Sequence, residues 1–229
     1  MTDHTVTAFD DDLKYITGKV TEMGGNAENM VAQAVSALIK GDHALAESVV
    51  VQDLVLDNLQ HELDERAVLV IAKRQPMATD LREIIGALRM ASDLERVGDL
   101  GKNIAKRSKE IGDVNHPKKV VRGLDHLTSL ALEQMKNVLD AYVNKDAKAA
   151  REVLSKDDEI DQVYTSLFRE LLTYMMEDPR NITFCTHLLF CAKNIERIGD
   201  HATNIAETIL YIVTGEAELS KHGTRPEFT

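Results

Sequence analysis

The chain contains no tryptophan, and aromatic residues make up only 4% of its 229 positions. A core without large aromatic side chains must be filled by aliphatic residues and methionine, which suits packing between helices better than a β-sandwich or barrel. Proline and glycine are also scarce, with 4 and 12 residues, so long stretches contain nothing that would break a helix. These absences indicate an all-α protein.

Positive charge is also in short supply. The 27 lysine and arginine residues are outnumbered by 38 aspartate and glutamate residues, and the formal net charge is −11. A nucleic-acid-binding surface requires clustered positive charge, and the sequence contains no cluster of basic residues interleaved with aromatic ones. We therefore expect no nucleic-acid partner.

Long apolar runs are missing as well. No run approaches the ~20 residues that a membrane-spanning helix requires, and no basic segment followed by an apolar one marks a signal peptide. The two cysteines, Cys185 and Cys191, are six residues apart and would face different sides of one helix. We expect buried free thiols in a reducing compartment, and hence a cytoplasmic protein.

Turn-forming residues divide the chain into six segments with the apolar periodicity of helices. In the second segment Leu56, Leu63 and Val70 recur every seven residues, as in the seam between packed helices. Short connections favour antiparallel neighbours. The predicted breaks are Gly41-Asp42, Gln75-Pro76, residues 112–117, Lys145-Asp146, Asp178-Pro179 and Gly215.

Capping residues predict two of the helix starts. Asp42 is placed to cap the second helix, and Asp80 and Glu83 have the spacing of a capping box at the start of the third.

The second half of the chain repeats the first. Residues 93–105 read DLERVGDLGKNIA and residues 194–206 read NIERIGDHATNIA, with seven identical positions. Residues 37–53 align with residues 141–157 at an offset of 104, whereas these two signature segments align at an offset of 101. Loops tolerate such a difference in length. The sequence therefore predicts a tandem duplication of a three-helix bundle, with six long helices in all.

We place the first three-helix repeat at residues 1–114 and the second at residues 115–215. A C-terminal tail follows at residues 216–229.

Each repeat carries two carboxylate pairs at i,i+4 spacing, one in its second helix and one in its third, and this spacing puts both members on one face. If the two helices pack side by side, four carboxylates could converge on a hard or borderline cation such as Mg, Mn, Fe or Zn. A solvated charged face explains most such pairs, but it does not explain their recurrence in both halves. The candidate ligands are Asp53, Asp57, Glu95 and Asp99 in the first repeat, and Asp157, Asp161, Glu196 and Asp200 in the second.

Four signature residues are expected to support these ligands. Arg96 and Arg197 stand three residues before an aspartate and can offset the repulsion between like charges. Asn103 and Asn204 continue the carboxylate row one turn further along the helix.

Three other signature residues have structural explanations. Gly98 and Gly199 each cost a helix about 1 kcal/mol relative to alanine, and we interpret both as points of close helix packing. His201 occupies the position of Leu100 in the first repeat, so the repeat gives it no shared role as a ligand. We expect an interface or packing histidine.

Catalytic motifs are absent. No histidine follows a glutamate by three residues, as in di-iron bundles, and there is no Gly-x-Ser-x-Gly segment, Walker A segment or dinucleotide fingerprint. We therefore expect a non-enzymatic protein.

The paired segments ERVGDLGKNIA and ERIGDHATNIA, with QPMATDLREI before the first, resemble the PhoU family of phosphate-transport and phosphate-regulon regulators. The resemblance covers nearly the whole chain and implies two three-helix bundles side by side, usually in a homodimer. It implies a negative regulator of phosphate uptake and of the phosphate-starvation response. Its partners would be the ATPase subunit of a phosphate ABC transporter and a sensor histidine kinase, and only they would bring it to the membrane.

The resemblance also bears on metal binding, because some family members bind multinuclear metal clusters through these carboxylates. The two repeats differ at Asp93, which is replaced by Asn194, so their sites are expected to differ in charge or occupancy. Composition and spacing alone allow an alternative, a metal-binding helical bundle without a role in phosphate signalling.

Overall fold

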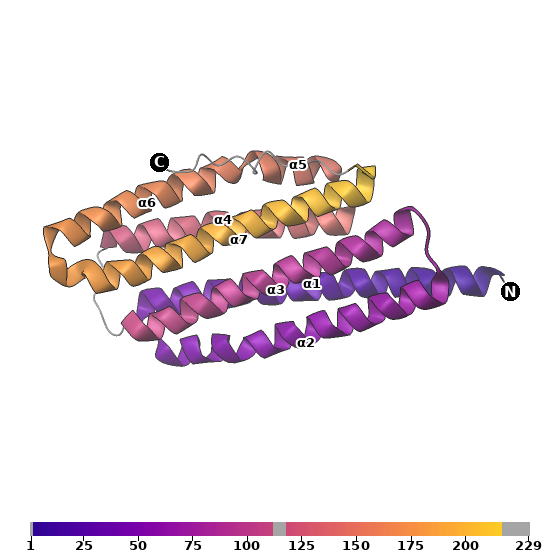
Figure 1. Cartoon of the computed structure of the whole chain (residues 1–229), viewed down its shortest axis with the longest axis horizontal. Coiled ribbons are helices and arrows are strands. Elements are labelled where there is room, and N and C mark those ends of the chain that lie inside the picture. The colour runs from indigo at the N-terminus through magenta and orange to yellow at the C-terminus, as the bar shows by residue number, and fades with distance from the viewer. Residues whose placement is uncertain (1, 112–117, 217–229) are drawn as a thin grey trace.

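The computed structural model describes residues 2–111 and 118–216 and folds them into two three-helix bundles that lie side by side (Figure 1). No β-strand occurs within these ranges. The elements of the first repeat are α1 (Thr2–Lys40), α2 (His43–Arg74) and α3 (Thr79–Ile111). Those of the second are α4 (Lys118–Asn144), α5 (Ala147–Ser155), α6 (Asp157–Glu177), the 3₁₀ turn η1 (Pro179–Asn181) and α7 (Ile182–Thr214). The all-α class and the tandem three-helix architecture are confirmed.

The predicted fifth helix is divided at Lys156 into α5 and α6. The break follows from local charge, because the first turn of α6 contains Asp157, Asp158 and Glu159, and negative charge stabilises a helix N-terminus. At the positions equivalent to Asp158 and Glu159 the first repeat has Leu54 and Val55, and α2 continues through them.

The predicted cap of α2 is confirmed, since the Oδ1 atom of Asp42 accepts a hydrogen bond from the Leu45 N–H at 2.9 Å. The predicted capping box of α3 is wrong. That helix begins at Thr79, so Asp80 lies inside its first turn, while the carboxylate of Glu83 pairs with Lys145 of the second repeat.

The predicted breaks between the described helices coincide with the turns observed there. The break at residues 112–117 and the repeat boundary after residue 114 lie outside the described residues, as does the tail beyond residue 216. The boundaries proposed for the two repeats and the tail stay predictions.

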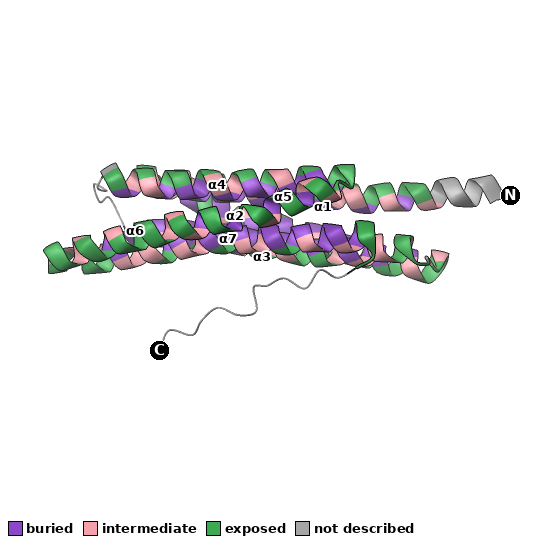
Figure 2. Ribbon diagram, turned by 90° about the horizontal axis from the view of Figure 1, so that it is seen from above, coloured by how far each residue is buried: buried purple, intermediate pink, exposed green. Residues whose placement is uncertain are grey.

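The signature helices α3 and α7 pack against each other at the centre of the molecule (Figure 1). Helices α1 and α4 also contact each other, and Figure 2 shows them in one layer with α3 and α7 in the other. Helix α2 flanks this centre on one side, and α5 and α6 flank it on the other. One continuous cluster of buried apolar residues includes both repeats, so the two bundles share a core.

The interpretation of the two signature glycines is confirmed. A Cβ atom on Gly98 would lie 2.3 Å from Leu56 Cδ2 of α2, and one on Gly199 would lie 2.8 Å from Ile160 Cδ1 of α6. Leu56 and Ile160 are equivalent positions of the repeat, so the same close helix contact occurs twice.

The cysteine prediction is confirmed as well, because Cys185 and Cys191 are free and buried. None of the helices in the described ranges combines the length and the apolar character needed to cross a membrane.

Candidate metal-binding faces

The predicted ligands of each repeat lie on two adjacent helices that are held close by the glycine contact. We call Asp53 and Asp57 of α2 with Glu95 and Asp99 of α3 the first acidic face. We call Asp157 and Asp161 of α6 with Glu196 and Asp200 of α7 the second acidic face. Because glycine brings the helix backbones together beside both pairs, the carboxylates of one helix face those of its neighbour.

An ammonium group lies within the first acidic face. The Nζ atom of Lys102 is 2.5 Å from Asp53 Oδ2 on α2 and 2.5 Å from Asp99 Oδ1 on its own helix. Burial alone would lower the pKa of Lys102, but its hydrogen bonds to these two carboxylates outweigh burial and raise that pKa. Lys102 therefore carries its charge at neutral pH and joins α2 to α3.

The other two carboxylates of this face are held close to like charges. Burial, followed by repulsion from Asp99, raises the pKa of Glu95. Burial, followed by repulsion from Asp53, raises the pKa of Asp57. Crowded carboxylates of this kind gain from a cation placed among them.

Arg96 has the predicted supporting position. Its Nη1 atom lies 3.8 Å from Asp99 Oδ2 and its Nε atom 3.6 Å from Glu95 Oε2. The Arg96 side chain is 61% exposed, so each contact contributes little beyond ~1 kcal/mol. Asn103, one turn beyond Asp99, is exposed on α3.

The second acidic face is neutralised differently. Glu196 is buried, and its Oε2 atom lies 2.5 Å from the Nζ atom of Lys193 on the same helix. Burial is the main reason that the pKa of Glu196 is raised, with Asp200 and Asp161 adding to the shift. Asp157 is also buried, in the first turn of α6, while Arg197 is exposed.

The two lysines have no counterparts across the repeat. Thr203 takes the place of Lys102, and Ser92 takes the place of Lys193. In the ion pairs described for these two lysines, Lys102 links carboxylates of two different helices, whereas Lys193 pairs with a carboxylate of its own helix. The two acidic faces therefore have different neighbouring cations, a difference separate from the Asp93/Asn194 exchange on which the expectation of unequal sites rested.

The donor set of these faces suits a cation. The Lys102 ammonium shows that a positive charge fits between the carboxylates of α2 and α3. Within the described ranges, however, no group of three or more histidine, cysteine, aspartate or glutamate side chains is already arranged to hold a metal ion. A metal at the first acidic face would require Lys102 to move aside, and metal binding stays a prediction.

A contact between the signature helices was not predicted. Asp93 Oδ1 lies 2.8 Å from His201 Nδ1 and accepts a hydrogen bond from Asn204 Nδ2 at 3.2 Å. Asn204 thus bonds to the opposite repeat instead of extending its own carboxylate row. His201 is an interface histidine as predicted, since it joins α7 to α3.

Comparison with known proteins places this arrangement in a family. A family model described as "PhoU domain" matches the chain twice, over residues 20–108 and 124–209. The chain is 59% identical over 224 residues to the phosphate-specific transport system accessory protein PhoU homolog of Rhizobium meliloti (strain 1021), covering 98% of this chain and 93% of the relative. The homolog of the same name from Caulobacter vibrioides (strain NA1000 / CB15N) is 49% identical over 221 residues, which is 96% of each protein.

A solved structure agrees with the sequence relatives. The crystal structure of PhoU from Pseudomonas aeruginosa superposes with a TM-score of 0.86 at 36% identity, covering 91% of this chain and 100% of that one. The resemblance seen in the paired signatures thus extends to both sequence and fold, and the chain belongs to the PhoU family.

Proposed function

We propose that this protein regulates phosphate transport, repressing phosphate uptake and the phosphate-starvation regulon when phosphate is plentiful. The observation that carries the proposal is the 59% identity, over 98% of the chain, to a phosphate-specific transport system accessory protein. An accessory protein acts through other components, so we propose a non-enzymatic adaptor in the cytoplasm. Its partners would be the transporter ATPase subunit and the sensor histidine kinase.

The structure supports an adaptor in a physical way. The shared core holds both acidic faces on rigid helices, and Asp93, His201 and Asn204 connect the two signature helices directly. A rigid scaffold presents charged groups at fixed positions, and such positions give a partner specificity and orientation. We also propose a homodimer, as the resemblance implies, which light scattering on the purified protein would test.

Metal binding belongs to the same proposal. The residues that would hold a divalent cation are the carboxylates of the two acidic faces, and a bound cation would neutralise them and lock their side chains. Asp53 and Asp99 would exchange the Lys102 ammonium for the metal, while at the second acidic face a cation would offset the repulsion among Glu196, Asp161 and Asp200.

The test is complementation in a strain from which this gene is deleted, with a phosphatase reporter of phosphate starvation measured in high phosphate. We expect deletion to derepress the reporter and the wild-type gene to restore repression. The Asp99→Ala/Asp200→Ala double variant should fail to restore it, because it removes one carboxylate from each face. Its helicity, measured by circular dichroism, should be unchanged, since both side chains lie at the edge of the core.

An Asp64→Ala variant, which removes an exposed carboxylate of α2 outside either face, serves as the matched control and should restore repression. Full repression by the double variant, at normal protein levels, would reject a role for the acidic faces. Unchanged repression after deletion would favour the second candidate function, a metal-binding bundle without phosphate signalling, which the crowded carboxylates support.

A further inference from the structure

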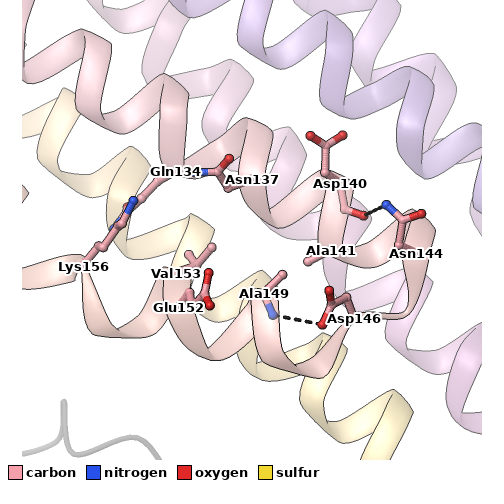
Figure 3. A pocket seen from close by; sticks show the side chains of 10 residues that line it. All are labelled: Gln134, Asn137, Asp140, Ala141, Asn144, Asp146, Ala149, Glu152, Val153 and Lys156. Carbon is pink, nitrogen blue, oxygen red and sulfur yellow. Dashed lines mark hydrogen bonds between the residues drawn. The ribbon is translucent and has the colours of Figure 1, made fainter.

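A polar pocket of about 220 Å³ lies between α4 and α5, away from the contact between the two signature helices (Figure 3). Its base is buried and contains Gln134, Ala141 and Val153. Its exposed rim carries the charged side chains of Asp140, Asp146, Glu152 and Lys156, and half-buried Asn137 and exposed Asn144 complete the polar lining. Lys156, which lines the pocket, is also the residue at which α5 ends and α6 begins.

Gln134 is the unusual member of this pocket. Its side chain is 4% exposed, and among the described residues neither its Nε2 nor its Oε1 atom has a hydrogen-bond partner. An amide left unpaired in a protein interior costs about 1–3 kcal/mol for each unsatisfied group. Such a group calls for a partner that the chain itself does not supply.

The first repeat shows what this position holds when no partner is required. Met30 is equivalent to Gln134 at the offset of 104, is 1% exposed, and packs beside Gly98. Gln134 packs beside Gly199 in the same way. Packing alone therefore accepts an apolar side chain here, and the polar atoms of Gln134 need another explanation.

The charges of the rim are separated along the pocket. Figure 3 shows Lys156 at the same end as Gln134 and Asn137, and Asp146 at the other end with Asn144, while the Asp140 side chain points away from the other lining residues. Lys156 is held loosely, 3.7 Å from Glu133 in a pair whose side chains are both more than half exposed. Glu152 lies between the two ends, beside Val153, and pairs with Lys148 at 3.7 Å. The Lys156 end thus offers an ammonium and amide groups to an anionic group, and the other end offers the Asp146 carboxylate to a cationic one.

We propose that this pocket binds a small zwitterion of amino-acid size, with its carboxylate towards Lys156 and the Gln134 amide and its ammonium towards Asp146. The volume is below the roughly 300–1,000 Å³ of sites for drug-sized ligands, which restricts the ligand to a small molecule. Three rim carboxylates against one ammonium disfavour a multivalent anion such as inorganic phosphate.

Gln134 connects the pocket to the helix that carries the second acidic face. The Oε1 atom of Gln134 lies 3.3 Å from the place where a Cβ atom on Gly199 would stand. Gly199 is flanked on α7 by Ile198 and by Asp200 of that face. A ligand that orders Gln134 therefore acts, through this side chain, on the helix that carries Glu196 and Asp200, whether or not a metal is bound there.

The test measures thermal stability and side-chain amide NMR signals of the full chain with four classes of small probe. The zwitterion probe is a set of small amino acids (glycine, alanine, serine and γ-aminobutyrate), and putrescine, inorganic phosphate and glycerol supply the cationic, anionic and neutral comparisons. We expect at least one amino acid to raise the melting temperature by about 5–10 °C at ~100 times its Kd and to shift the Gln134 amide signal.

Gln134→Met restores the residue of the first repeat and should fold at least as stably as the wild type while losing this response. Gln162→Met, which changes an exposed glutamine of α6, is the matched control and should keep it. A response to phosphate or putrescine in place of the amino acids would overturn the zwitterion assignment. No response to any probe, or an equal response in Gln134→Met, would mean that ordered water alone satisfies the amide.

Discussion

Two lysines that the repeat does not share determine how the acidic faces are neutralised. Lys102 places its ammonium between carboxylates of two helices, whereas Lys193 contacts Glu196 on its own helix. The equivalent positions carry Thr203 and Ser92. Carboxylates that are identical in the two signatures therefore have different neighbours, and equal affinity for a cation is not expected of them.

Replacing Lys102 by threonine, the residue of the second repeat, should raise the affinity of the first acidic face for Mn²⁺ by about tenfold. The variant removes a competing positive charge and keeps all four carboxylates, and tenfold corresponds to ~1.4 kcal/mol. Isothermal titration calorimetry would measure the change. Lys106→Thr, one turn further along α3 and exposed, is the control, and equal Mn²⁺ binding by both variants would refute competition by Lys102.

The cysteines should be unreactive in the folded protein. Burial raises the pKa of the Cys191 thiol to about 12 and also raises that of Cys185. At pH 8 only about 1 in 10⁴ of the Cys191 thiols would be ionised. Ellman's reagent should therefore modify neither thiol until the protein is unfolded, while an added thiol in an exposed Ser129→Cys variant should react at once. Rapid modification of the wild type would contradict the buried positions.

The same thiol predicts a pH dependence of stability. Unfolded Cys191 releases its proton above its ordinary pKa of 9.0, whereas the folded thiol keeps its proton up to about pH 12. The unfolded state binds fewer protons in this window, so the free energy of unfolding should fall by about 1.4 kcal/mol in total between pH 8 and 10 relative to a Cys191→Ala variant. Urea denaturation of both proteins between pH 8 and 10 would measure the difference, and parallel profiles would exclude this contribution.

At the scale of the element, glycine sets how closely the second and third helices of each repeat approach. Gly98 meets Leu56 and Gly199 meets Ile160, so the contact beside each carboxylate pair is the same. The second helix differs between the repeats, because α2 is continuous whereas its counterpart is divided into α5 and α6. The pocket beside Gln134 occurs next to the divided helix.

Gly98→Ala should lower the free energy of unfolding by about 1–3 kcal/mol, because the added methyl group would stand 2.3 Å from Leu56 Cδ2 in a packed core. The gain in helix propensity, about 1 kcal/mol, offsets only part of this cost. Gly18→Ala is the control, since nothing lies within 4 Å of its Cβ position and it should stabilise the protein. Urea denaturation would compare the two, and equal stability would argue against close packing at Gly98.

At the scale of the whole molecule, the two repeats form one folding unit. Their cores are continuous, and the contact of α3 with α7 is reinforced by hydrogen bonds from His201 and Asn204 to Asp93. A Cβ atom on Gly86 of α3 would lie 2.4 Å from Ile212 Cδ1 of α7, so this glycine lets the repeats approach closely near the start of α3 as well. Each repeat therefore buries part of the apolar surface of the other.

The chain should therefore unfold in a single cooperative transition. Scanning calorimetry should give equal calorimetric and van't Hoff enthalpies, as for one domain. Gly86→Ala crowds Ile212 at the contact between repeats and should lower the melting temperature of both repeats together. Two resolved transitions, in either protein, would show that the repeats fold independently.

The sequence by itself determined the helical class, the duplication, most breaks and the close packing at Gly98 and Gly199. These features depend on residue types and on spacing along one chain, which periodicity reveals. Comparison of the two halves of the sequence also placed the eight candidate ligands on paired helices, because i,i+4 spacing defines a helix face. The capping box failed because Glu83 finds Lys145 in another helix, a partner that local spacing cannot indicate.

Only the tertiary structure decided which side chains meet across helices. Lys102 is visible in the sequence three residues after Asp99, but its second partner, Asp53, lies 49 residues earlier in the chain. Gln134 is flanked by Glu133 and Met135 in the sequence, and its unpaired amide becomes evident only where α5 leaves a pocket against α4. The Lys102 ion pairs and the unpaired Gln134 amide both depend on how separate helices pack. In the low dielectric of the interior a polar contact that forms is strengthened, and a polar group left unpaired destabilises the protein.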